Sequence, residues 1–133
     1  MGRKILLIDD DVVLLTLMKS AFSAAGYIVQ AADNGRKGLK ALETYDPDLV
    51  ITDIVMPEME GIGTIIAIKK KPRAPKVIAI SGVGRLRDSD YLKWASHLGA
   101  DEVLAKPFKM SELIKLSRRV IETETSNPQP LEV

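Results

Sequence analysis

The chain has 133 residues, enough for one domain with a buried core, and 46% of them are hydrophobic and 28% charged, as in ordinary soluble proteins. A net charge of +1 gives no overall field that would favour nucleic acid or an anionic membrane, and the absence of cysteine excludes disulfides, thiolate metal sites and cysteine nucleophiles. The first apolar run is too short to span a membrane and lacks a signal-peptide pattern, so a cytoplasmic location is expected.

The first half of the chain alternates between short apolar runs and segments with helical spacing. Apolar residues recur every three or four positions after Val12, and Gly26 ends that pattern. Asp33-Asn34-Gly35 indicates a turn. The expected elements are a strand at Lys4–Ile8, a helix from Val12, a strand at Tyr27–Ala31, a helix at Gly38–Thr44 and a strand at Leu49–Thr52.

The second half continues the alternation. The expected elements are a helix at Ile62–Lys70, a strand at Val77–Ile80, a helix at Leu86–Leu98, a strand at Val103–Leu104 and a last helix capped by Ser111. The polar, proline-bearing residues 123–133 are expected to be a loose tail or linker stump after a domain at 1–122. Repeated strand–helix alternation predicts an α/β fold, with a parallel sheet, right-handed crossovers and helices on both faces.

Polar residues follow four of the predicted strands. They are Asp9 and Asp10, Asp53, Ser81 and Lys106. Since the carboxyl ends of parallel strands share one edge, these side chains are expected to converge there. Three clustered carboxylates repel one another, and oxygen ligands of this kind suit Mg²⁺. A lysine and a hydroxyl beside them indicate an incoming group with several anionic oxygens, most simply a phosphoryl group.

Several motifs occur in order at these strand ends: Ile8-Asp9-Asp10-Asp11, Asp53-Ile54-Val55-Met56-Pro57, Gly61, Ser81-Gly82, Gly99-Ala100-Asp101 and Lys106-Pro107-Phe108. Together they resemble the receiver domains of two-component response regulators, including the single-domain chemotaxis (CheY-like) type, over residues 4 to 121. The resemblance implies a flavodoxin-like, doubly wound, five-stranded parallel sheet of order 2-1-3-4-5 with helices on both faces.

The resemblance also implies roles for the acidic residues. Asp53 would accept a phosphoryl group from a phosphohistidine on a sensor histidine kinase or phosphotransfer protein. Asp10 would ligate Mg²⁺ together with Asp53 and the backbone carbonyl of Val55, and Asp9 would bind it mainly through water. Such chemistry needs positioning and charge neutralisation more than covalent help.

Lys106 and Ser81 would each contact a phosphoryl oxygen, and the Lys106-Pro107 peptide bond would be cis. The helix at 86–98, the last strand and the last helix would form the output face, for a downstream protein or a second copy of the chain. No membrane and no direct nucleic-acid contact is implied. The protein would catalyse only its own phosphorylation and dephosphorylation.

Two departures from the family pattern bear on the switch. Val103 occupies a position that is usually aromatic, so a ring flip is not available there. Val55 and Val83 are apolar where polar residues help to position a hydrolytic water, and slow self-dephosphorylation is therefore expected.

Other interpretations fit parts of the sequence. Asp9-Asp10-Asp11 alone would read as a helix N-cap cluster, and the basic residues at 69–71, 73 and 76 as a solvated helix end. An aspartyl-phosphate phosphatase is disfavoured, because such hydrolases commonly carry a second aspartate two residues after the nucleophile, where this chain has Val55. A receiver-like interaction module without phosphorylation is the remaining alternative.

Overall fold

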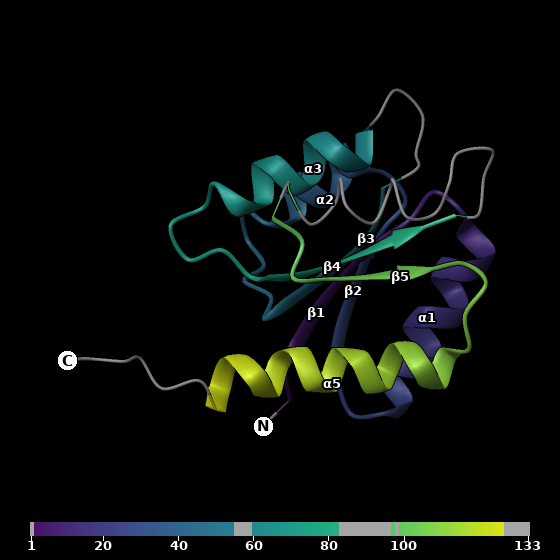
Figure 1. Ribbon diagram of the computed structural model, residues 1–133. Helices are drawn as coiled ribbons and strands as arrows, with labels where there is room; N and C mark the ends of the chain where they lie inside the picture. Colours follow the sequence, from purple (N-terminus) through teal and green to yellow (C-terminus); the bar gives the residue numbers. More distant parts are fainter. Residues whose placement is uncertain (1, 55–59, 83–96, 98, 127–133) are drawn as a thin grey trace.

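The computed structural model describes residues 2–54, 60–82, 97 and 99–126. Its strands are β1 (Lys4–Ile8), β2 (Ile28–Ala32), β3 (Leu49–Asp53), β4 (Lys76–Ser81) and β5 (Glu102–Ala105), and its helices are α1 (Val12–Ala24), α2 (Gly35–Ala41), α3 (Glu60–Lys69) and α5 (Met110–Ser126). All strand pairs are parallel and the sheet order is β2-β1-β3-β4-β5 (Figure 1). This confirms the predicted fold class.

The sheet separates two apolar layers. Helices α1 and α5 cover one face, and α2 and α3 cover the other (Figure 1). Side chains alternate between faces along each strand, so Ile5 and Leu7 of β1 join the α1–α5 layer while Leu6 and Ile8 join the α2–α3 layer. Burial on both faces is the reason that β1 and β3 read as continuous apolar runs.

Three helix starts differ from the sequence prediction, and one of them is α3, which begins at Glu60 rather than Ile62. Helix α2 begins at Gly35 rather than Gly38, because Asn34 is its N-cap and accepts a hydrogen bond from the backbone N–H of Lys37 at 2.8 Å. Helix α5 begins at Met110, so the expectation that Ser111 caps it is wrong. Instead, the Glu112 carboxylate accepts a hydrogen bond from the backbone N–H of Lys109 at 2.8 Å.

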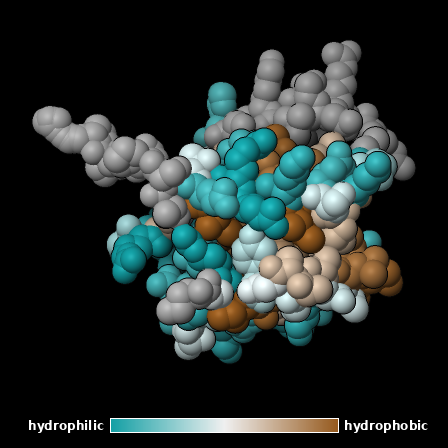
Figure 2. All heavy atoms as spheres, turned by 90° about the horizontal axis from the view of Figure 1, so that it is seen from below, coloured by the Kyte–Doolittle hydropathy of each residue, from teal (hydrophilic) through white to brown (hydrophobic). Residues whose placement is uncertain are grey.

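Helix α5 extends through Ser126, so the first part of the expected tail is helical and the remainder lies outside the described residues. The predicted helix at 86–98 also lies outside them, apart from His97, which is helical and exposed. Seen from the side of α5, the surface carries both hydrophilic areas and hydrophobic patches (Figure 2). In the part of the chain that the structure describes, no helix is long and apolar enough to cross a membrane.

Helix α2 packs so closely on β1 that position 38 has no room for a side chain. A Cβ atom at Gly38 would overlap Cδ1 of the buried Ile8 and lie 2.8 Å from its Cγ1. We expect Gly38→Ala to lower the free energy of unfolding by about 1–2 kcal/mol, because overpacking outweighs the gain in helix propensity.

Gly63→Ala is the matched control for that substitution, since a Cβ there meets nothing within 4 Å in helix α3. It should leave stability unchanged or raise it by up to about 1 kcal/mol. Urea unfolding of both variants measures the difference. Equal stabilities for Gly38→Ala and Gly63→Ala would contradict the close packing of α2 on Ile8.

Candidate functional site

The polar residues that follow the strands meet at the carboxyl edge of the sheet, as predicted. Asp53 and Ser81 are the last residues of β3 and β4, and Asp9 and Lys106 follow β1 and β5 directly. The register brings them together because Asp53 lies beside Ile80 on β4. Asp9, Asp53 and Ser81 are buried, with exposed fractions of 0%, 3% and 1%.

Lys106 contacts two of the carboxylates at once. Its Nζ donates a hydrogen bond to Oδ2 of Asp53 at 3.0 Å and lies 3.4 Å from Oδ2 of Asp9. Burial alone would lower the pKa of Lys106, but the hydrogen bond to Asp53 and the negative charges of Asp53 and Asp9 outweigh it and raise the pKa above its ordinary value. The ammonium is therefore fixed as a cation between β1 and β3.

Asp9 is the least solvated member of the cluster. Burial raises its pKa, an effect that the Asp53 charge increases and the backbone N–H of Asp11, 2.8 Å from Asp9 Oδ1, reduces. Its other oxygen, Oδ2, is buried and accepts no well-formed hydrogen bond among the described residues, although the Lys106 ammonium lies 3.4 Å away as an ion pair. An ionised carboxylate with an oxygen in that state suits a cation ligand.

The three consecutive aspartates divide between two tasks. The Asp11 side chain accepts a hydrogen bond from the backbone N–H of Leu14 at 3.1 Å and is the N-cap of α1, while Asp9 and Asp10 belong to the acidic cluster. Sequence reasoning treated capping and metal binding as alternatives. It missed that the Asp11 backbone also orients Asp9, for which the short spacing of the two residues is the only signal.

A divalent cation fits this cluster. Asp9, Asp10 and Asp53 each offer a carboxylate oxygen, and these oxygens all lie within 4.8 Å of one another. Three carboxylates against the single Lys106 ammonium leave two formal negative charges, which a hard dication would balance. Val55, predicted to contribute its backbone carbonyl, lies outside the described residues, as does Val83.

Ser81 and the start of the segment after β5 are joined through the backbone. The N–H of Lys106 donates to the carbonyl of Ser81 at 2.7 Å, and the Ser81 hydroxyl donates to the carbonyl of Gly82 at 3.4 Å. The Lys106-Pro107 peptide bond is cis, as predicted. The hydroxyl and the ammonium are thus positioned by adjacent strands at the same edge.

Asp9→Asn should raise the free energy of unfolding by about 1 kcal/mol at pH 7 in EDTA, because it removes a buried charge. The raised pKa means that folding favours protonated Asp9, so the cost of the ionised form is absent below the unfolded pKa and grows as pH rises through the folded one. The variant's advantage should therefore shrink in acid, and Mg²⁺ should stabilise it less than the wild type.

Urea unfolding with and without Mg²⁺ at several pH values measures these effects, with the exposed Asp46→Asn as control. A wild type that is more stable than Asp9→Asn in EDTA, at pH 7, would contradict the cost assigned to Asp9.

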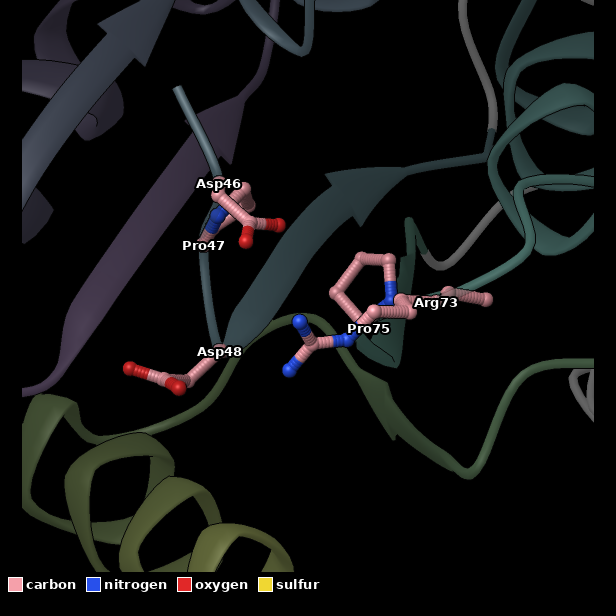
Figure 3. Close-up of a pocket in the computed structure, with 6 residues that line it drawn as sticks. Asp46, Pro47, Asp48, Arg73 and Pro75 are labelled. Atoms are coloured by element: carbon pink, nitrogen blue, oxygen red, sulfur yellow. The ribbon is translucent and has the colours of Figure 1, made fainter. Parts of the chain in front are cut away.

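A separate hollow of about 260 Å³ lies at the opposite edge of the sheet. Figure 3 shows residues 46–48, before β3, facing residues 73–75, before β4. The Asp48 carboxylate there already accepts a hydrogen bond from the backbone N–H of Lys4 and lies 3.8 Å from the Arg3 guanidinium. The hollow therefore belongs to the packing of the amino edge rather than to the acidic cluster.

Comparison with known proteins agrees with this arrangement. The fold and the acidic cluster define a doubly wound domain with its site at the carboxyl edge, and the family model of the response regulator receiver domain matches residues 5–118. The chain belongs to the response regulator receiver family.

Individual relatives differ in how much of their length is matched. Chemotaxis protein CheY of Thermotoga maritima is 33% identical, with 90% of this chain and 98% of that protein covered. DNA-binding transcriptional regulator NtrC of Rhizobium meliloti is 35% identical over 98% of this chain but only 26% of its own length. A CheY-like receiver structure from Methanospirillum hungatei has a TM-score of 0.85 and 26% identity, covering 96% of this chain and all of that one.

Proposed function

We propose that this receiver domain is a phosphorylation-controlled switch, in which Asp53 accepts a phosphoryl group from a phosphohistidine on a sensor histidine kinase or phosphotransfer protein. The observation that supports it best is the Lys106 ammonium 3.0 Å from Asp53 Oδ2, inside a cluster of three carboxylates. This combination offers a nucleophile, a fixed cation for phosphoryl oxygens and ligands for a divalent metal.

In the proposed reaction a carboxylate oxygen of Asp53 attacks phosphorus, the new P–O bond forms and the P–N bond to the histidine breaks. Asp9, Asp10, Asp53 and the Val55 carbonyl would hold Mg²⁺, which neutralises charge on the phosphoryl group when bound. Lys106 already lies against Asp53 and would move its hydrogen bond to a phosphoryl oxygen.

The signal would leave the site through Ser81 and Lys106. The added phosphoryl charge would draw the Ser81 hydroxyl away from the Gly82 carbonyl and would attract the Lys106 ammonium. These two changes would move the segments that precede and follow β5. The proposed output face is formed by residues 86–98, β5 and α5, for a downstream protein or a second copy. Val103, half-buried against the α2–α3 layer, has no ring to flip, so loop movement would carry the change.

The start of α1 supports docking of a phosphodonor protein beside the site. Val12, Val13 and Leu17 are exposed, Val13 by 72%, and α1 begins directly after the acidic residues. Exposed aliphatic side chains at this place suit an apolar partner surface.

We propose a cytoplasmic switch that catalyses no reaction besides its own phosphorylation and slow dephosphorylation.

Incubation with Mg²⁺ and acetyl phosphate, followed by intact mass spectrometry, tests the proposal. The expected result is one phosphoryl group per chain, formed in Mg²⁺ and absent in EDTA. If no donor, including a phosphorylated histidine kinase, produces the adduct in Mg²⁺, the protein is an interaction module and the proposal is wrong.

A further inference from the structure

We infer that Asp101 is a positioning residue, which holds the register of β5 on β4 and thereby places Lys106 against Asp53. Asp101 directly precedes β5 at the amino edge of the sheet, and Lys106 directly follows that strand at the carboxyl edge. The inference concerns the placement of Lys106, and only its phosphorylation readout rests on the proposed function.

Asp101 is paired twice with one residue of β4. Its backbone N–H donates to the carbonyl of Val77 at 2.8 Å, and its Oδ2 accepts from the N–H of Val77, also at 2.8 Å. The Asp101 carboxylate thus accepts the hydrogen bond from the Val77 N–H that a backbone carbonyl would accept if β5 were one residue longer. Both polar groups of Val77 are bound to the same residue just before the first register pair, Ile78 with Glu102.

Two lysines make the same carboxylate a junction of three segments. Lys69 Nζ, at the end of α3, lies 3.2 Å from Oδ2 and also donates to the carbonyl of Pro75 at 3.3 Å. Lys76 Nζ, at the start of β4, lies 3.8 Å from Oδ1. The side chains of Lys69, Lys76 and Asp101 are each less than one third exposed, so the junction is partly shielded from water.

The chain before Asp101 is shaped to admit Lys69. Gly99 has φ of +111°, and a Cβ atom there would lie 3.1 Å from Cγ of Lys69. The Lys69 side chain therefore passes against the backbone of the segment that leads into β5. The sequence prediction of a solvated helix end is therefore wrong for Lys69, the first residue of the basic run at 69–71.

Side-chain burial fixes the register of β5 only weakly, so the register depends on the backbone ladder with β4, which ends at the bond from the Lys106 N–H to the Ser81 carbonyl, and on Asp101 at the other end. β5 has four residues, β4 is its one partner among the strands of the described residues, and all four residues are half-buried rather than fully buried. A strand with no strongly buried face is prone to slippage, and a slip of one residue turns every side chain to the other face. Such a slip would displace Lys106 from Asp53, 3.0 Å away.

Hydrogen exchange of the full chain tests whether Asp101 holds the register of β5, and it does so independently of phosphorylation. In Asp101→Ala the amides of β5 should exchange about 10-fold faster, while those of β1 and β3 keep wild-type rates. Asp101→Asn keeps an oxygen acceptor for the Val77 N–H and should recover most of the protection. The control Glu102→Gln changes the adjacent acid, whose carboxylate makes only a long ion pair of 4.0 Å with the exposed Arg119. It should leave the exchange rates of the β5 amides unchanged.

Unchanged exchange in β5 would overturn the inference. Equal acceleration in all strands would also overturn it, because that result describes general destabilisation.

Another measurement compares the rate of the acetyl phosphate reaction with the Mg²⁺ affinity measured by titration calorimetry. Asp101→Ala should slow phosphorylation about 10-fold and leave Mg²⁺ affinity unchanged or higher, since the carboxylates at the ends of β1 and β3 stay in place and lose only a competing ammonium. Loss of both together would contradict an effect through Lys106.

The two measurements separate this inference from the proposed function. If the wild type forms no phosphoryl adduct, the proposed function fails, and hydrogen exchange alone decides whether Asp101 holds β5. If the wild type is phosphorylated but β5 exchanges normally in Asp101→Ala, the proposed function stands and the positioning role is wrong.

Discussion

Replacing Asp53 with asparagine should reduce phosphoryl adduct formation by acetyl phosphate at least about 100-fold, because a neutral amide is not a nucleophile toward phosphorus. The substitution keeps the shape of a side chain that is 5% exposed at the end of β3, so the fold should persist. Intact mass spectrometry over a time course, with circular dichroism to check the fold, measures the effect.

Asp46→Asn is the matched control for this loss. Asp46 is exposed and lies before β3, at the edge opposite Asp53. This variant should be phosphorylated at the wild-type rate. If Asp53→Asn acquires the adduct as fast as Asp46→Asn does, another residue is the acceptor, and the role given to Asp53 is wrong.

Lys106→Met should lower the free energy of unfolding by about 2–3 kcal/mol in EDTA at pH 7. Methionine keeps most of the side-chain volume but removes the ammonium that contacts both Asp9 and Asp53, whose carboxylates would then repel each other in a buried site. Mg²⁺ should restore part of the loss, since a dication at the same carboxylates replaces the missing positive charge.

The pH dependence follows from the raised pKa of Lys106. Stabilisation by the protonated Lys106 amine is complete below its pKa in the unfolded chain and is lost only as pH rises through the higher pKa in the folded chain. The stability difference between the wild type and Lys106→Met should therefore persist at neutral pH. Urea unfolding with and without Mg²⁺ measures it, with Lys109→Met as control because Lys109 is exposed. Equal stability of the two variants in EDTA would show that Lys106 adds nothing to the fold.

The fold was predictable where hydrophobic patterning dominates. β1 and β3 lie between two apolar layers, so their unbroken apolar runs identified them as strands of a parallel sheet. Helix starts were harder, because a cap is a local choice between competing side chains. The Asp33-Asn34-Gly35 pattern indicates a turn although Asn34 is the N-cap of α2, and the sequence favours Ser111 as a cap although Glu112 reaches back to the backbone of Lys109.

The candidate site was predictable in membership but not in detail. Strand ends and family resemblance together indicated Asp9, Asp53 and Lys106, because parallel strands must bring their carboxyl ends together. The sequence does not show that Asp9 is buried while Asp10 is exposed, since that depends on the direction in which the chain leaves β1. Asp101 was identified only as part of a motif, because its partners are 24 and 32 residues away.

The separation of the interior into two apolar layers has a consequence for how the chain tolerates change. A substitution that changes side-chain volume on one face of the sheet contacts residues of that apolar layer only. Its neighbours in that layer can therefore compensate without displacing the helices on the other face. The two layers are therefore expected to drift in sequence as independent units. Selection for a new partner could then remodel the surface of one layer while the other, and the edge that holds Asp53, stays as it was.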